Sequence, residues 1–206
     1  MMKTRLLAPR DFRAMPWKNG LGITHEIAVF RSLEDEPSGT FVWRLSMAEV
    51  GTSAPFSHFP GCDRTILLVD GRGMTLDSGS DGYHVLDHKF QPYSFCGEWQ
   101  TEGTLIDGPC LDFNIMVDRS RARAEVSVKT LSRTPQPLPL RGSPLALFAL
   151  SGTVQLRSEE PSHSYTIPTR HILLVEPESA APLSGWLTAQ AQEATVLLIE
   201  ISRQPD

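Results

Sequence analysis

The sequence predicts an all-β protein with little helix, built as two stacked small barrels of the jelly-roll type. Its apolar runs are short and rich in Val, Ile, Phe and Leu, and Gly, Pro, Asp or Ser interrupts them about every ten residues. A weak internal repeat, with a proline-rich stretch between its two copies, favours a duplicated unit. Small barrels also leave few of the exposed sheet edges that so many strands would otherwise create.

Five segments in the first part of the chain carry the clearest strand pattern. They are HEIAVF (25–30), FVWRLSMAEV (41–50), RTILLVD (64–70), GMTLDS (73–78) and LDFNIMVD (111–118). Each is short and rich in β-branched, aromatic or other apolar residues, and no long amphipathic helical pattern competes with them. We therefore expect each segment to form a strand.

The stretch LSRTPQPLPLRGSPL (131–145) contains four prolines. Proline removes a backbone donor and favours an extended connector. We therefore expect a first barrel at residues 1–131 that carries the ligand pocket, a connector at 132–144, and a second, degenerate barrel at 145–206.

Three pairs of segments support the duplication. LLVDGRGMTL (67–76) is echoed by FALSGTVQL (148–156), EWQT (98–101) by GWLT (185–188), and FNIMVDR (113–119) by LLIEISR (197–203). The offsets are 81 residues for Gly71 to Gly152, 87 for Trp99 to Trp186 and 84 for Arg119 to Arg203. Near-constant offsets over three elements indicate a repeated β unit.

Composition narrows the class of protein. A net charge of -5 over 206 residues gives no broad basic surface, so we expect no nucleic-acid partner. No segment has the length and hydropathy of a membrane span, and the N-terminus is too polar for a signal peptide, so we expect no membrane partner. Three widely spaced cysteines, Cys62, Cys96 and Cys110, favour a reducing compartment, and cytoplasm is the expected location.

The segment GTSAPFSHFPGCDRTILLVDGRG (51–73) has the spacing of a metal-binding motif without its ligands. The motif runs Gly, five residues, His-x-His, four residues, Glu, six residues, Gly. This chain fills those places with Gly51, Ser57, Phe59, Arg64 and Gly71. Because an arginine repels a cation, we expect no metal and no cofactor there.

Histidines elsewhere offer little for a metal. Only His84 and His88 share a short window, YHVLDH, and a third ligand is missing from the obvious places. Zinc or iron is therefore not expected, although histidines distant in the sequence can still meet in a fold.

Four segments resemble the HutD and Ves family of bacterial proteins, in the cupin superfamily. They are PWKNGLGITHEIAVF (16–30), FVWRLSMAEV (41–50), PFSHFPGCDRTILLVDGRGMTL (55–76) and DGPCLDFNIMVDR (107–119). The resemblance implies a two-barrel cupin (bicupin) fold, a small-molecule site in the first barrel, and a part in histidine catabolism or stress response without an established reaction. The chain departs from the family pattern at Leu21, where glycine is usual, and at His25, where arginine is usual.

Strand alternation selects the first candidate site residues. In FVWRLSM, Arg44 lies on the face opposite the large apolar residues, and in DFNIMV, Asp112 and Asn114 share one face. Because a barrel alternates interior and exterior positions, all three side chains can point into one lumen. The alternative is that they point to solvent.

Arg64 occupies the place where a metal-binding cupin has its inward-pointing carboxylate ligand. A guanidinium there offers five donors in a fixed fork and suits a bidentate contact with a ligand carboxylate. The alternative is a structural salt bridge to Asp63 or Asp112, since a buried charge needs a partner. We expect Ser57, another former ligand position, to border the same pocket.

The segment PWKNGLG reads as a loop that presents Trp17, Lys18 and Asn19. Gly20 and Gly22 permit backbone conformations that other residues avoid. An aromatic wall beside a few polar donors suits recognition of a small polar molecule. The alternative is that Trp17 anchors the N-terminal segment to the core.

Two classes of function remain. The first is a metal-free protein that binds a small anionic metabolite, of the urocanate or formyl- or formimino-glutamate class that the resemblance suggests, in a regulatory role. The second is a cupin enzyme: a metal-free isomerase or hydrolase with Asp112 and Lys18 as acid and base, or an oxygenase with unconventional metal ligands. A homodimer is compatible with either.

Overall fold

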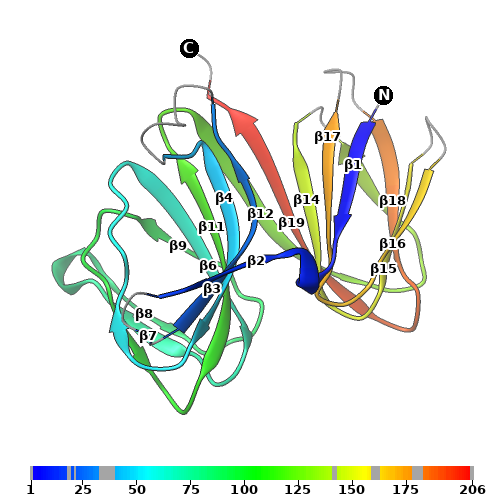
Figure 1. Ribbon diagram of the computed structural model, residues 1–206. Helices are drawn as coiled ribbons and strands as arrows, with labels where there is room; N and C mark the ends of the chain where they lie inside the picture. The colour runs from blue at the N-terminus through cyan, green and yellow to red at the C-terminus, as the bar shows by residue number, and fades with distance from the viewer. Residues whose placement is uncertain are drawn as a thin grey trace. The chain divides into compact units, whose positions relative to one another are not determined.

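The chain folds into two compact units in a computed structural model that describes residues 2–17, 20, 22–32, 40–140, 143–158, 163–177 and 183–204. The first unit comprises Phe12–Arg123 with Arg203–Asp206, and the second comprises Met1–Asp11 with Ala124–Ser202. Apart from two single 3-10 turns, at Pro9–Asp11 and Gly79–Asp81, the regular structure of the described residues is β (Figure 1). The all-β prediction is therefore confirmed.

The first unit consists of two antiparallel sheets. Its larger sheet has the order β2-β3-β4-β11-β6-β9, and its smaller one the order β5-β10-β7-β8. The strands are β2 (Arg13–Pro16), β3 (Gly22–Phe30), β4 (Trp43–Val50), β5 (Ala54–Pro55), β6 (Cys62–Asp70), β7 (Met74–Asp77), β8 (Tyr83–Leu86), β9 (Tyr93–Cys96), β10 (Glu102–Leu105) and β11 (Cys110–Asp118). All five segments with the clearest strand pattern are among them, as β3, β4, β6, β7 and β11.

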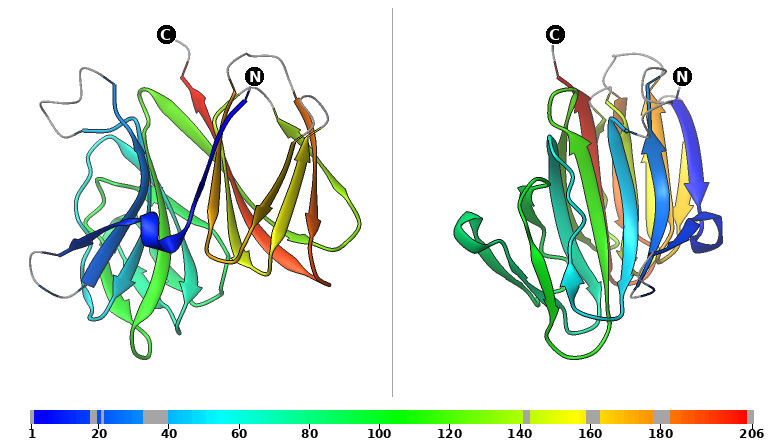
Figure 2. Two further views of the ribbon diagram at one scale, coloured as in Figure 1. Left: turned by 45° about the vertical axis from the view of Figure 1, so that its right-hand side comes forward. Right: turned by 60° about the vertical axis from the view of Figure 1, so that its left-hand side comes forward.

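The second unit has the same two-layer construction. Its sheets have the orders β1-β17-β14-β19-β12 and β13-β18-β15-β16. The strands are β1 (Met2–Leu7), β12 (Ala122–Leu131), β13 (Gln136–Leu140), β14 (Leu145–Ser151), β15 (Val154–Ser158), β16 (His163–Ile167), β17 (Ile172–Pro177), β18 (Leu183–Ala189) and β19 (Ala194–Arg203). Figure 2 shows the two layers of each unit from two further directions.

The ladder between β11 and β6 in the first unit matches the ladder between β19 and β14 in the second. In the first, Asp112 pairs with Leu68, Asn114 with Ile66 and Met116 with Arg64; in the second, Val196 pairs with Ala149, Leu198 with Leu147 and Glu200 with Leu145. The offsets that the sequence suggested therefore hold residue by residue along these strands. The duplication is structural, and it makes position-by-position comparison of the two units possible.

The turn after each of these inner strands also repeats. Gly71 has φ +89° and Gly152 has φ +66°, a left-handed conformation that favours glycine. A Cβ at Gly71 would meet the Pro109 carbonyl oxygen at 2.6 Å, and one at Gly152 would meet the Glu193 carbonyl oxygen at 2.6 Å. The repeated Gly in the sequence therefore marks one turn that is used twice.

The segments EWQT (98–101) and GWLT (185–188) do not occupy corresponding positions in the two units, so this part of the expected repeat is wrong. Trp99 lies in the turn before β10, whereas Trp186 lies inside β18 and pairs with Arg157. The residue of β10 that corresponds to Leu187 is Gly103. Leu187 pairs with Leu156 of β15, and Gly103 pairs with Leu76 at the matching place of β7. A four-letter similarity was too short to fix the register.

The division of the chain differs from the expected boundaries 1–131, 132–144 and 145–206 at three strands. Strand β12, expected at the end of the first barrel, lies beside β19 in a sheet of the second unit. Strand β1 pairs with β17, so the N-terminal strand belongs to a sheet of the second unit. The expected connector contains β13, which pairs with β18 at the edge of its sheet. An edge strand tolerates Pro137 and Pro139 because one side of it makes no ladder hydrogen bonds.

The two interiors differ in composition. The interior of the second unit is a cluster of aliphatic residues from both of its sheets, with Tyr165 packed against it. In the first unit an apolar cluster of residues from β4, β6, β7, β8, β9 and β11 fills one part of the space between the sheets. Polar side chains line another part, and the candidate site lies there.

Candidate functional site

A cavity of about 560 Å³ opens in the first unit. Six of the eight side chains that the sequence selected line it: Trp17, Arg44, Ser57, Arg64, Asp112 and Asn114. The other two, Lys18 and Asn19, lie outside the described residues. This volume is in the range of small-molecule sites.

Strands β4 and β11 supply most of the polar lining by simple alternation. Arg44 and Ser46 point to the cavity from β4, and Asp112 and Asn114 point to it from the neighbouring strand β11, where Asn114 pairs with Ser46. The inward orientation inferred from the sequence is therefore confirmed over the solvent-facing alternative. Ser46 was missed, although its spacing of two from Arg44 places it on the same face.

Arg64 on β6 is buried, with 5% of its surface exposed. Its Nε and Nη2 atoms donate to Oδ1 of Asn114 at 3.4 and 3.3 Å, and Nη1 donates to the carbonyl oxygen of Ser57 at 3.4 Å. These bonds use three of the five N–H donors of a guanidinium. Within the described part of the chain, two donors therefore remain for another partner.

Three aromatic rings surround the Arg64 guanidinium. Its Cζ lies 4.8 Å from the ring centre of Phe95, 5.0 Å from that of Phe56 and 5.8 Å from that of Phe59. Cation–π attraction compensates part of the cost of burial. Burial lowers the pKa of Arg64 to about 10, so the side chain is still a cation at neutral pH.

The salt-bridge alternative for Arg64 is only partly realised. Asp63 pairs instead with Arg119, whose Nε lies 2.8 Å from its carboxylate. Asp112 attracts Arg64 through space and counteracts the lowering of its pKa. The hydrogen bonds of Arg64 nevertheless go to neutral oxygens, so its charge is held by an amide, a carbonyl and aromatic rings.

Asp112 is the second buried charge carrier of the cavity, with 1% of its surface exposed. Burial raises the pKa of Asp112 to about 7, while the charge of Arg64 and a hydrogen bond with the Asn114 side chain lower it. Its Oδ1 atom has no hydrogen-bond partner among the described residues. A buried acceptor without a partner costs about 1–3 kcal/mol, so this atom marks an incomplete site.

Arg44 and Trp17 are each held by a polar partner on β3. Arg44 Nε donates to Glu26 Oε2 at 3.0 Å, and both side chains are largely buried, at 15% and 11% exposure. The Trp17 indole N–H donates to Thr24 Oγ1 at 2.8 Å, and the ring packs against the apolar cluster. Trp17 thus packs against the core and also lines the cavity, and the charge of Arg44 is paired with Glu26.

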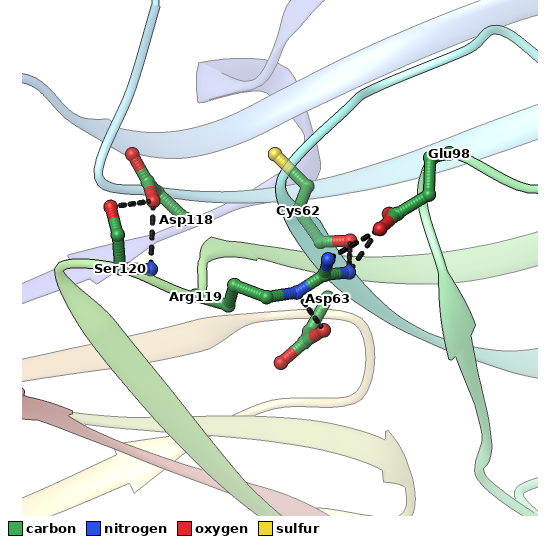
Figure 3. A network of polar contacts seen from close by, with 6 residues as sticks. All are labelled: Cys62, Asp63, Glu98, Asp118, Arg119 and Ser120. Carbon is green, nitrogen blue, oxygen red and sulfur yellow. Dashed lines mark hydrogen bonds and ion pairs between the residues drawn. The ribbon is translucent and has the colours of Figure 1, made fainter.

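A cluster around Arg119 holds the strand that carries Arg64 (Figure 3). Besides Asp63, Arg119 contacts both carboxylate oxygens of Glu98 and donates to the Cys62 carbonyl oxygen at 3.0 Å. It therefore ties the end of β11 to the start of β6 and to the turn after β9. Sequence reasoning found Arg119 only as a repeat marker, because its partners are distant in the sequence.

Other reactive residues have ordinary partners. His58, which lies four residues before Cys62, bonds through Nε2 to the Glu98 carbonyl oxygen at 2.9 Å. Burial is the main cause that raises the pKa of the Cys62 thiol, which makes it a poor nucleophile. His84 stacks on Tyr93 with ring centres 3.8 Å apart.

The former metal positions do not rebuild a metal site. Ser57 and Phe59 lie beside Arg64, with the Phe59 ring over the guanidinium. In the described part of the chain no three His, Cys, Asp or Glu side chains are grouped as metal ligands would be. A cation at this place would meet the fixed charge of Arg64.

Comparison with solved structures shows the fold class of the chain. A cupin barrel-domain protein from Leptotrichia buccalis matches with TM-score 0.59 and 8% identity over 88% of this chain and 89% of that protein, which is a likeness of fold alone. A conserved protein of unknown function from Pseudomonas aeruginosa matches with TM-score 0.85 and 31% identity, and HutD from Pseudomonas fluorescens with 0.83 and 27%. Both matches cover 98% of this chain and 100% of the other. The molecule is a two-barrel cupin.

The sequence comparisons then give the family. The HutD family model matches residues 9–197, and the chain belongs to the HutD family. Protein Ves from Cronobacter sakazakii is 37% identical over 153 residues, covering 72% of this chain and 79% of that protein. The resemblance read from the four sequence segments is confirmed.

No helix in the described part of the chain is long and apolar enough to cross a membrane.

Proposed function

We propose that the first unit binds a small anionic metabolite without a metal, and that binding serves a regulatory role in histidine utilisation or stress response in the cytoplasm. Arg64 carries this proposal, because it puts a fixed, buried cation with two remaining donors at the wall of a cavity of ligand size. Asn114 and Ser57 hold the guanidinium, so it is preorganised. The HutD and Ves relationship supports metabolites of the urocanate or formyl- or formimino-glutamate class.

The balance of charge in the cavity supports an anion as ligand. Arg44 is neutralised by Glu26 at 3.0 Å. Asp112 has a pKa near neutrality and therefore carries only part of a negative charge at pH 7. Among the described residues that line the cavity, Arg64 is thus a cation whose hydrogen bonds go to neutral oxygens, and a carboxylate would complete its fork with charge-assisted hydrogen bonds.

The test is a titration of three proteins: the unchanged chain, Arg64→Lys and Arg64→Ala. Lysine keeps the charge and loses the fork, so the affinity for urocanate or N-formylglutamate should fall about tenfold to a hundredfold, as expected for a charge-assisted hydrogen bond. Arg72→Lys, in the exposed turn after β6, is the matched control and should bind as the unchanged protein does.

Melting curves separate binding from folding in that experiment. If Arg64 serves structure alone, both variants should melt earlier while the folded fraction keeps its affinity. Undiminished binding by Arg64→Ala would contradict the proposal. Calorimetric titration with urocanate, N-formylglutamate and histidine covers the proposed ligand class and one related zwitterion.

A metal-free enzyme is the second candidate, and Asp112 favours it. A carboxyl group with a pKa near 7 in a cavity is suited to general acid–base catalysis. Turnover of the same metabolites by metal-free protein, lost in Asp112→Asn, would support the enzyme, and binding without turnover would support the binding protein. Elemental analysis of the purified protein tests the metal-free part of both, and about one transition metal per chain would contradict it.

A further inference from the structure

The free oxygen of Asp112 is the feature of the cavity that a simple anion leaves unexplained. Oδ1 is buried, lies in a side chain that lines the cavity, and has no hydrogen-bond partner in the described chain. A carboxylate ligand on Arg64 offers it no proton and repels it. An anion with no other polar group would therefore leave this acceptor unsatisfied.

The fold does not require a carboxylate at this position. The corresponding residue of the second unit is Val196, which is fully buried in the aliphatic cluster. Valine fills this strand position in the second unit with no polar atom, so the position packs well in a fully apolar form. The acidic group in the first unit is thus an addition to a fold that is complete without it.

We propose, on the basis of the function proposed above, that Asp112 determines ligand specificity by accepting a hydrogen bond from an N–H group of the ligand. The ligand is then a small molecule that carries a carboxylate for Arg64 and an N–H donor for Asp112. Such a donor satisfies Oδ1 and offsets the repulsion between Asp112 and the ligand's acid group.

The positions of the two groups limit the size of this ligand. Arg64 is bonded to the Asn114 side chain, and Asn114 is two residues from Asp112 on the same face of β11. Residues two apart on a strand are separated by about 7 Å. The acid and the N–H group should therefore lie only a few bonds apart, as in an imidazole acid or an N-acylated or N-formimino amino acid.

A matched pair of probes tests the inference. Urocanate carries an imidazole N–H, and 3-(2-furyl)acrylate has a nearly identical shape with a ring oxygen and no N–H. At pH 8, above the pKa of about 7 of Asp112, the unchanged protein should bind urocanate about tenfold to a hundredfold more tightly, the range expected for one hydrogen bond to a charged acceptor.

Two variants assign this preference to Asp112. Asp112→Val, which installs the residue found at the corresponding position of the second unit, should bind the two probes equally, because it removes the acceptor and the repulsion. Asp112→Asn retains a neutral acceptor oxygen and should keep part of the preference. Asp107→Asn, an exposed acidic residue in the turn before β11, is the charge-matched control and should retain all of it.

Each outcome decides between the two proposals. A ratio near one in the unchanged protein, tighter binding of the furan, or a preference that survives in Asp112→Val would overturn the inference while leaving Arg64-dependent binding intact. If neither probe nor N-formylglutamate binds, the proposed function fails and the inference fails with it. Melting curves of both Asp112 variants verify that the folded protein is being titrated.

Discussion

The two units use the same strand ladder to enclose different interiors. Three polar residues of the first unit, Arg64, Asp112 and Asn114, line its cavity. The residues at the corresponding positions of the second unit are Leu145, Val196 and Leu198. All three counterparts belong to the aliphatic cluster of the second unit. One chain therefore contains the same barrel interior in a packed form and in a polar form.

The packed form shows what the barrel needs in order to fold, which is apolar volume at these strand positions. The polar form contains two ionisable groups that are costly to bury and do not replace that volume more favourably. Their presence is not explained by stability, and the binding role proposed above would account for it. The difference teaches that the cavity of the first unit is a departure from a self-sufficient core, and that β6 and β11 contribute three polar positions to it whose counterparts are apolar.

Exchanging the residue types of the corresponding positions 112 and 196 should give the largest effect on the free energy of unfolding. Val196→Asp places a carboxylate in a cluster that consists of apolar side chains, and we expect the free energy of unfolding to fall by about 3–5 kcal/mol at pH 8. Asp112→Val makes the reverse change and should be neutral or stabilising, because it removes an unsatisfied buried acceptor. Urea unfolding of both variants measures this asymmetry.

Val196→Thr is the control for that experiment, because it has the shape of valine with one hydroxyl and no charge. It should cost clearly less than Val196→Asp. Equal losses in Val196→Asp and Asp112→Val would mean that Asp112 is as necessary to its unit as Val196 is, and the comparison would fail.

The pH dependence of stability should show a smaller effect of the same origin. Asp112 has a pKa of about 7 in the folded chain against an ordinary value of 3.8, mainly because of its burial. The folded state therefore holds this proton more tightly, and its contribution to stability is complete below about pH 4 and disappears as the pH rises through 7. Arg64, whose charge acts on Asp112, has a pKa of about 10 and remains a cation throughout this range.

The unchanged protein should thus lose, relative to Asp112→Asn, a few kcal/mol of unfolding free energy between pH 4 and pH 8. Urea titrations at four pH values in that interval provide the measurement, with Asp107→Asn as a control that should follow the unchanged protein. Parallel curves for the unchanged protein and Asp112→Asn would show that Asp112 has an ordinary pKa.

Sequence reasoning reached the site where it depended on strand geometry. Period-two alternation was sufficient for Arg44, Asp112 and Asn114, because each strand has one inner face. The spacing of a lost metal motif was sufficient for Arg64, because motif spacing fixes a position relative to the turn at Gly71. Both kinds of information are local in the sequence.

What the sequence did not reveal depends on contacts between distant segments. Phe95, which faces Arg64 from β9, and Glu26, which neutralises Arg44 from β3, follow from strand order and register. The register of β3 against β4 also contains an irregularity directly after Glu26, which no local pattern predicts. The pairing of β1 with β17 joins opposite ends of the chain, and for that reason the expected boundaries differ from the units.

The repeated arginines give the smallest expected effect. Arg119 directly follows β11 and has ion pairs with Asp63 and Glu98, whereas its counterpart Arg203 ends β19 and is exposed. Because the Arg119 side chain is itself about one-third exposed, at 35%, solvent weakens these pairs. Arg119→Met should therefore cost about 1 kcal/mol, and Arg203→Met should cost less than about 0.5 kcal/mol.

Raising the salt concentration to about 1 M should reduce the first loss and leave the second unchanged, since screening acts on exposed ion pairs. If denaturant unfolding shows equal losses for the two arginines, the cluster at β6 is not what distinguishes the two units at this strand end.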